Sequence, residues 1–316
     1  MLAIGVGFQT RETDMTRIVA GVDGSAHADR ALRWAVQEAQ AHGAELELML
    51  AYSSRFPGLT STARGLAPGS VTSRRSALVD ANQAIAEQTL DGVVTRHRGL
   101  LDQVKWTTTL TPVLASSAAQ ALIEAGDEAD LVVVGSRGLG GFGTLLLGST
   151  SYRTAGHAPC PVAVVPDVET PITAPRRIVV GIDASRGARR ALRWAVEEAV
   201  LRDVPLTVAH GYHLPTMMLL GGVQSHGPLD QMRADARHDA EHVVARALEI
   251  VDIPPDVQVD RIITMGSAAG LLLDLADGDT LVVVGTRGHG AIGRMVLGSV
   301  SHQVLHHATC PVVVAP

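Results

Sequence analysis

The sequence predicts an α/β fold built from two tandem, doubly wound, open parallel sheets. The first observation is an internal duplication: Leu131–Ser151 returns as Leu281–Ser301, and ALRWAV occurs at both Ala31–Val36 and Ala191–Val196. The second is that, within each copy, short apolar segments alternate with segments whose apolar residues recur at helical spacing. Duplication and alternation together predict two parallel sheets with helices on both faces.

Length and composition indicate a two-domain globular protein. The chain has 316 residues, of which 46% are hydrophobic and 18% charged, which suits two domains of about 150 residues each. No apolar run approaches the roughly 18 residues needed to span a bilayer, and Met1–Phe8 lacks a basic segment and a cleavage site. We therefore expect a cytoplasmic protein without a membrane span. A net charge of −6 disfavours general nucleic-acid binding.

The duplication also predicts the domain boundaries. Residues 1–15 precede the first matched segment and are expected to form a frayed leader. The first domain is expected to span 16–166 and the second 176–316. Residues 167–175, rich in proline and threonine, are expected to be the linker.

The elements of the first repeat follow from its apolar periodicity. The expected strands are Ile18–Val22, Leu46–Tyr52, Val104–Leu110, Leu131–Val134 and Pro161–Pro166. Helices are expected after Asp23 and over Ser76–His97, Ala118–Ala125 and Ser149–His157. Ser53–Arg75, which is rich in Ser, Gly and Pro, is interpreted as a mobile loop.

The second repeat predicts the same order. Its expected strands are Ile178–Ile182, Leu206–Tyr212, Val257–Thr264, the apolar segment before Gly285, and Pro311–Pro316. Helices are expected after Asp183 and over Leu229–Val251, Ala268–Ala276 and Ser299–His307, with a shorter loop at His213–Pro228.

A glycine-rich loop follows the fourth strand of each repeat. Its spacing, G-x2-G-x9-G-S, is formed by Gly135, Gly138, Gly148 and Ser149, and again by Gly285, Gly288, Gly298 and Ser299. Glycines let backbone N–H groups approach a ligand, and the serine opens a helix whose first amides are unpaired. Each loop therefore suits a phosphate group.

This spacing resembles the nucleotide-binding motif of the ATP-binding branch of the universal stress protein family. The resemblance covers nearly the whole chain twice. It implies a Rossmann-like sheet of the adenine nucleotide alpha hydrolase-like type, with ATP, with or without Mg²⁺, as the ligand of each domain. It also implies that Asp23 and Asp183 line the nucleotide site and that the backbone of Ala51 and Gly211 holds adenine.

The candidate binding residues are the loop glycines and serines together with neighbours at the strand ends. They are Gly21, Asp23, Ala51, Gly135, Arg137, Gly138, Gly148, Ser149 and Thr150, and in the second repeat Gly181, Asp183, Gly211, Gly285, Arg287, Gly288, Gly298, Ser299 and Val300. Ser151 and Ser301 are further phosphate candidates.

From spacing alone, two readings of several residues stay open. Asp23 and Asp183 either contact ribose or Mg²⁺, or cap the following helices. Arg137 and Arg287 either pair with phosphate or are exposed structural arginines.

Two other nucleotide-binding motifs agree less well with the sequence. Gly138, Gly140 and Gly143 also satisfy the dinucleotide-binding G-x-G-x-x-G, but they follow the fourth strand instead of the first. The phosphate lysine of a Walker A loop is absent, since Lys105 lies far from either loop.

The spacing of the histidines and cysteines in the sequence does not indicate a metal site. His238 with His242, and His302 with His306, have helical spacing but no third ligand in sequence, so they are interpreted as surface histidines. Cys160 and Cys310 are expected to be buried apolar residues.

The function expected from these features is that of an ATP-binding regulator of stress or growth. No nucleophile with its base is found, so turnover is not expected. A slow ATPase or adenylyl-transferring hydrolase, and a scaffold with vestigial sites, are the alternatives. Ala115 and Ser116 near the equivalent of Gly266, and Ala184 in place of Gly24, are expected to make the two sites unequal.

The last strand of each repeat predicts the assembly. A sheet edge exposes unpaired N–H and C=O groups, which another strand can satisfy. Because the chain carries two such strands, we expect Val162–Val165 to pair with Val312–Val314, forming a pseudo-twofold dimer of domains. A homodimer would then form through other surfaces, chiefly helices.

Overall fold

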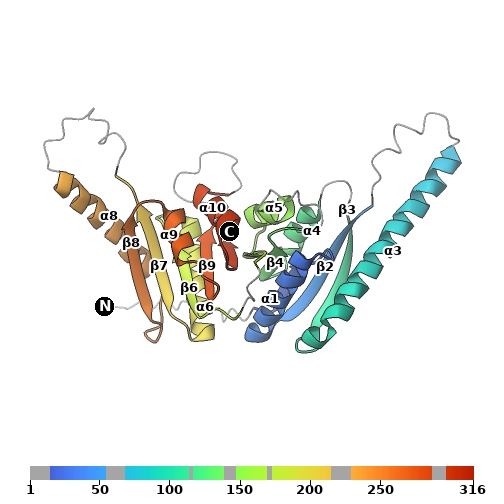
Figure 1. The fold of residues 1–316 in the computed structure, drawn as a ribbon, viewed down its shortest axis with the longest axis horizontal. Coiled ribbons are helices and arrows are strands. Elements are labelled where there is room, and N and C mark those ends of the chain that lie inside the picture. Colours follow the sequence, from blue (N-terminus) through green and yellow to red (C-terminus); the bar gives the residue numbers. More distant parts are fainter. Residues whose placement is uncertain are drawn as a thin grey trace, which may run out of the picture.

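The computed structural model describes residues 15–54, 68–113, 117–138, 147–168, 173–214, 229–286 and 297–316. The expected leader, most of the two long loops and the middle of the linker lie outside these residues. The described chain forms one ten-stranded sheet with the order β3-β2-β1-β4-β5-β10-β9-β6-β7-β8 (Figure 1). Each half is parallel, as the sequence predicts.

The first half contains five strands and four described helices in strict alternation. The strands are β1 (Arg17–Gly21), β2 (Glu45–Ser53), β3 (Trp106–Val113), β4 (Leu131–Gly135) and β5 (Val162–Val165). The helices are α1 (Ala26–His42), α3 (Pro68–Leu101), α4 (Ala118–Ala125) and α5 (Ser149–His157). One face of the sheet packs on α1 and α3, and the other packs on α4 and α5.

The second half repeats this arrangement. Its strands are β6 (Arg177–Gly181), β7 (Leu206–Tyr212), β8 (Val259–Met265), β9 (Thr280–Gly285) and β10 (Val312–Ala315). Its described helices are α6 (Arg186–Arg202), α8 (Leu229–Ile250), α9 (Ala268–Leu275) and α10 (Ser299–His307). None of the helices in the described part of the chain combines the length and apolar character of a membrane span.

Helix α3 corrects one sequence expectation. It begins at Pro68 and not at Ser76, so the last part of the expected loop Ser53–Arg75 is helical. Proline is well suited to the first turn of a helix, because its fixed φ is already helical and its missing N–H has no partner there in any case. The Ser, Gly and Pro content of this segment therefore does not indicate a continuous loop.

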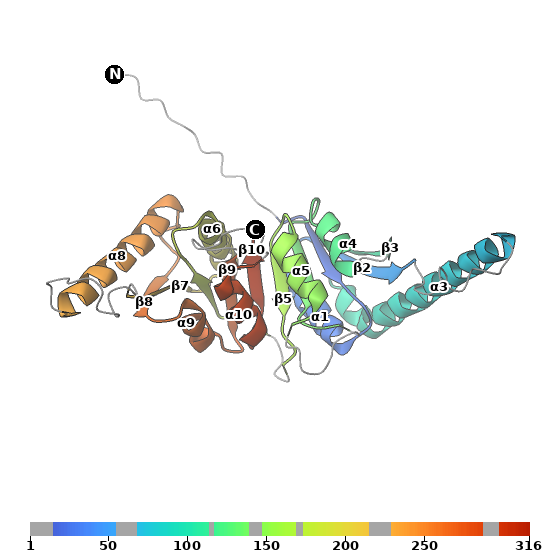
Figure 2. The ribbon, with the colours of Figure 1, turned by 90° about the horizontal axis from the view of Figure 1, so that it is seen from above.

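The two halves meet at the centre of the sheet through β5 and β10. These strands pair antiparallel, with Val312 opposite Val164, Val313 opposite Ala163 and Val314 opposite Val162 (Figure 2). Every residue of both strands is buried. The expected pairing of the terminal strands is confirmed, and it removes both edges from solvent.

The core is continuous across this junction. One apolar cluster contains residues of α1 and β1 together with residues of α6 and β6, and Ala163 and Val313 link the two groups. Cys160 and Cys310 are buried free thiols, as expected, and burial raises the pKa of both to about 12.

Replacing Val313 with proline tests whether the junction depends on the β5–β10 ladder. Proline removes a backbone donor from a central strand. We therefore expect the unfolding transition to lose its cooperativity and both halves to become susceptible to limited proteolysis. Val313→Ala is the matched control: it keeps the donor and should cost on the order of 2 kcal/mol through the lost packing. Equal unfolding behaviour of the two variants would contradict a role for the ladder.

Candidate functional site

The predicted crevice lies where β1 and β4 end side by side. These strands pair directly, and the strand order reverses between them, which is where open α/β sheets bind ligands. A Cβ atom built on Gly138 would lie 2.5 Å from Oδ2 of Asp23. The structure therefore brings the Asp23 turn and the start of the glycine loop together, as expected from the sequence.

The two aspartates are not the helix caps. Oδ1 of Asp23 accepts a hydrogen bond from the amide of Ser25 at 2.9 Å, and Oγ of Ser25 accepts one from the amide of Ala28 at 3.2 Å. Asp183 and Ser185 make the same pair of bonds in the second half. In both halves the serine caps the helix and the aspartate shapes the turn, and in the first half the second oxygen of Asp23 lies at the start of the loop.

Helix α5 presents its N-terminus to the same crevice. Its N-cap residue is Gly148, whose amide donates to the carbonyl of Ser136 at 2.7 Å. Within the described residues no side chain caps this helix, nor α10 behind Gly298. The first amides, from Ser149 and Thr150 onwards and from Ser299 and Val300 in the second half, are thus of the kind that binds anions.

The side chain of Arg137 adds an unsatisfied donor to this region. Its Nε is buried and has no acceptor among the described residues. A buried guanidinium nitrogen without a partner is costly, and an anion in the crevice would satisfy it. Arg287 and Gly288 lie outside the described residues.

Ser151 and Ser301 correct a second expectation. The hydroxyl of Ser151 donates to the carbonyl of Gly135, and that of Ser301 donates to the carbonyl of Gly285, both at 2.6 Å. Each hydroxyl has a single proton, which it donates to the carbonyl at the end of a strand. These serines therefore anchor α5 and α10 to the sheet and are not phosphate donors.

Four of the predicted glycines have a packing role in the structure. A Cβ on Gly135 would lie 2.8 Å from the carbonyl oxygen of His27, and one on Gly285 would lie 2.6 Å from the carbonyl carbon of Gly187. Equivalent atoms on Gly21 and Gly181 would meet a leucine of α4 or α9 at 3.2 Å and 2.7 Å. These glycines let helices approach the strand ends that frame the crevice.

The two crevices differ on the side where β2 and β7 end. A Cβ on Gly211 would lie 2.6 Å from the amide nitrogen of Ala268, the first residue of α9. The first half has Ala51 at this place. The connection from β3 to α4 spans residues 114–117, whereas the matching connection from β8 to α9 spans only residues 266–267.

The same connections differ in backbone conformation. In the second half the positive φ of +146° falls on Gly266, and Ser267 then caps α9 by accepting from the amide of Gly270 at 3.2 Å. In the first half Ser117 makes no cap bond, and its φ of +126° is a strained conformation for a residue with a Cβ. The described connections beside the two predicted sites therefore differ, and unequal ligand binding stays a prediction. Ala115 and Ser116, on which part of that prediction rests, lie outside the described residues.

A close histidine–carboxylate contact beside the crevice has no counterpart among the sequence predictions. His27, on the first turn of α1, has its Nδ1 3.0 Å from a carboxylate oxygen of Asp167, which follows β5. The two residues are far apart in sequence and neither belongs to a motif, so no signal in the sequence indicates the pair.

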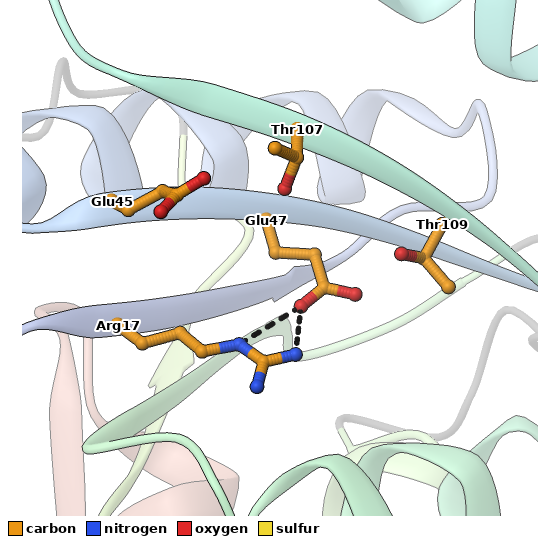
Figure 3. Close-up of a pocket in the computed structure, with 5 residues that line it drawn as sticks. All are labelled: Arg17, Glu45, Glu47, Thr107 and Thr109. Atoms are coloured by element: carbon orange, nitrogen blue, oxygen red, sulfur yellow. Dashed lines mark hydrogen bonds and ion pairs between the residues drawn. The ribbon is translucent and has the colours of Figure 1, made fainter.

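A polar hollow of about 340 Å³ lies elsewhere, over the first halves of β1, β2 and β3. Figure 3 shows its lining residues, which are Arg17, Glu45, Glu47, Thr107 and Thr109. Arg17 bonds Oε2 of Glu47 through Nη2 at 2.6 Å and Nε at 3.1 Å. Arg17 and Glu47 satisfy each other, and none of the predicted binding residues lies there.

Comparison with known proteins gives one consistent result. The family model described as the universal stress protein family matches residues 15–166 and 175–316. A universal stress protein of Mycolicibacterium smegmatis is 32% identical over 94% of this chain and 96% of its own length. One of Mycobacterium tuberculosis is 30% identical over 94% of both chains. A crystal structure of a universal stress protein from Archaeoglobus fulgidus has the same fold over 95% of both chains, with a TM-score of 0.57 and 20% identity.

Gly135→Ala tests the packing role assigned to the strand-end glycines. The new methyl group would meet backbone atoms of α1, which cannot move aside cheaply, so we expect a loss of stability on the order of 1–3 kcal/mol in urea unfolding. Gly99→Ala in α3 is the control, because nothing lies within 4 Å of a Cβ there. That change should be neutral or stabilising by up to about 1 kcal/mol. A Gly135→Ala protein as stable as the control would refute the assignment.

Proposed function

The chain belongs to the universal stress protein family, and from this premise we propose that each of its two domains binds one molecule of ATP in the crevice described above. We further propose that the protein acts as a nucleotide-dependent regulator of stress or growth. The observation that carries the proposal is the helix N-terminus behind Gly148, which no described side chain caps, facing the turn of Asp23 beside Gly138.

The residues of the crevice suit the parts of ATP. The amides that open α5 and the buried Nε of Arg137 suit the phosphates. The carboxylate of Asp23 suits the ribose hydroxyls or a Mg²⁺ ion carried by the phosphates, which prefers carboxylate oxygen. Ala51, at the end of β2, is the expected contact for adenine. The described part of the second domain offers Asp183, Gly211 and the N-terminus of α10 in the same roles.

The regulatory role rests on a cycle of binding and release, and it is separable from turnover. Incubating the protein with excess ATP and measuring released phosphate distinguishes the two. Phosphate release over many turnovers, lost in a variant lacking both Asp23 and Asp183, would replace the regulator with a slow ATPase.

Titration calorimetry with ATP should give two sites per chain. Gly138→Val should remove the first and Gly288→Val the second, because a branched side chain blocks backbone approach to the phosphates. The fold should survive Gly138→Val, since the atoms within 4 Å of the new Cβ belong to the side chain of Asp23 and not to the backbone. Gly99→Ala serves as the control and should retain both sites. Two sites remaining in the folded Gly138→Val protein would disprove the proposed location.

The difference between Ala51 and Gly211 yields a second prediction. In a Gly138→Val background, only the second site is expected to bind ATP. Gly211→Ala should then weaken that binding, because the new methyl group displaces the start of α9. The reciprocal change, Ala51→Gly in a Gly288→Val background, only removes a partly buried methyl group, displaces no backbone, and should leave ATP affinity nearly unchanged. Thermal denaturation of each variant separates loss of the site from loss of the fold. Equal effects of the two substitutions would show that the adenine sides of the sites are equivalent.

A further inference from the structure

A charged cluster is buried where the two domains meet on the α1 and α6 side of the sheet. Helix α1 contributes Glu38 and His42, and helix α6 contributes Glu198 and Arg202. The two helices lie on either side of the junction in Figure 1. Glu38 and Glu198 occupy equivalent positions of the duplicated sequence, as do His42 and Arg202. The domains thus supply the same acid and a different base.

Arg202 bonds one oxygen of each carboxylate. Its Nη2 donates to Oε2 of Glu38 at 2.5 Å, and its Nε donates to Oε2 of Glu198 at 2.9 Å. The remaining oxygens are treated differently. Oε1 of Glu198 lies 2.7 Å from Nε2 of His42, whereas Oε1 of Glu38 is buried and has no partner among the described residues.

The cluster is short of positive charge. Both glutamate side chains are 1% exposed, and one guanidinium faces two carboxylates. Ionised oxygens in such surroundings require a cationic partner.

A proton on His42 meets only part of this need. Its Nε2 already bonds Glu198 and lies 3.9 Å from Oε2 of Glu38, which is beyond hydrogen-bond range. The unpartnered Oε1 of Glu38 would remain unsatisfied. A larger cation that contacts several oxygens at once removes this difficulty.

We propose that Glu38, His42 and Glu198 bind a divalent transition-metal ion of the Zn²⁺ class, which joins the two domains. Each residue offers one ligand atom, and these atoms lie within 4.8 Å of one another, so small side-chain movements bring them to the bond lengths of about 2.0–2.2 Å that zinc requires. Imidazole and carboxylate are ligands of this class of ion.

Arg202 has a supporting role in this site. It hydrogen-bonds the Oε2 atom of each glutamate and leaves the Oε1 atoms for the metal, as outer hydrogen bonds do around many metal ligands. Its own charge opposes the ion, which limits affinity. The ligands come from α1 and α6, so binding the ion holds the domains together and stabilises the folded chain.

The test uses the full chain, stripped with a chelator and free of nucleotide, and titrated with ZnCl₂. Calorimetry should show one Zn²⁺ site at the junction, and the melting temperature should rise with Zn²⁺ concentration. His42→Arg should stay folded, because it copies the Glu198–Arg202 pair of the second domain, and should lose both the site and the Zn²⁺-dependent shift. His242→Ala, on the exposed face of α8, should keep them.

Arg202→His should have the opposite effect to His42→Arg. Because it predicts a gain of Zn²⁺ binding, a folding defect cannot produce the expected result. The substitution adds an imidazole and removes the opposing charge, so it should bind Zn²⁺ more tightly than the unmodified chain. The proposal is overturned if ZnCl₂ neither binds nor shifts melting in the unmodified and Arg202→His proteins, or if His42→Arg retains the site.

Discussion

The antiparallel pairing of β5 with β10 is the interaction on which the rest of the molecule depends. Two short, wholly buried strands exchange backbone hydrogen bonds and turn two five-stranded parallel sheets into one. Because the pairing relates the halves by a pseudo-twofold axis, it also sets α1 against α6 and closes the Glu38–Arg202 cluster. Only β3 and β8 remain as edges of the described sheet, far from the junction.

The duplicated halves share a framework and differ at a few positions where the chemistry is decided. Serine caps, strand-end glycines and the serines that anchor α5 and α10 recur in both halves with nearly the same distances. Ala51 against Gly211 alters one wall of each crevice, and the positive φ before α9 falls on Gly266 whereas the one before α4 falls on Ser117. At the interface between the domains, the first half contributes the imidazole of His42 where the second contributes the guanidinium of Arg202. Duplication has preserved the scaffold while these few side chains have diverged.

Most of the fold was predictable because it rests on local signals. Helices Ala118–Ala125 and Ser149–His157 were predicted to the residue, and the β5–β10 pairing followed from two apolar strands that would otherwise be sheet edges. The start of α3 was missed because composition alone does not distinguish a proline that opens a helix from one in a loop.

The site was predictable only in part. The expected strand order predicted that Asp23 and Gly138 lie close together. Packing decides which hydroxyl points toward the sheet, so the assignment of Ser151 to phosphate was wrong. The cluster of Glu38, His42, Glu198 and Arg202 left no trace in the sequence. Glutamates on an amphipathic helix resemble a solvated face, and their partners lie about 160 positions away.

Native mass spectrometry of the purified, intact chain tests the central claim most directly, because it counts bound nucleotides without assuming their location. We predict a series of masses that saturates at two ATP molecules per chain as ATP is added, with the second molecule bound at a different affinity from the first. A chain that stays at its unliganded mass in excess ATP would contradict the assignment of the two crevices as nucleotide sites.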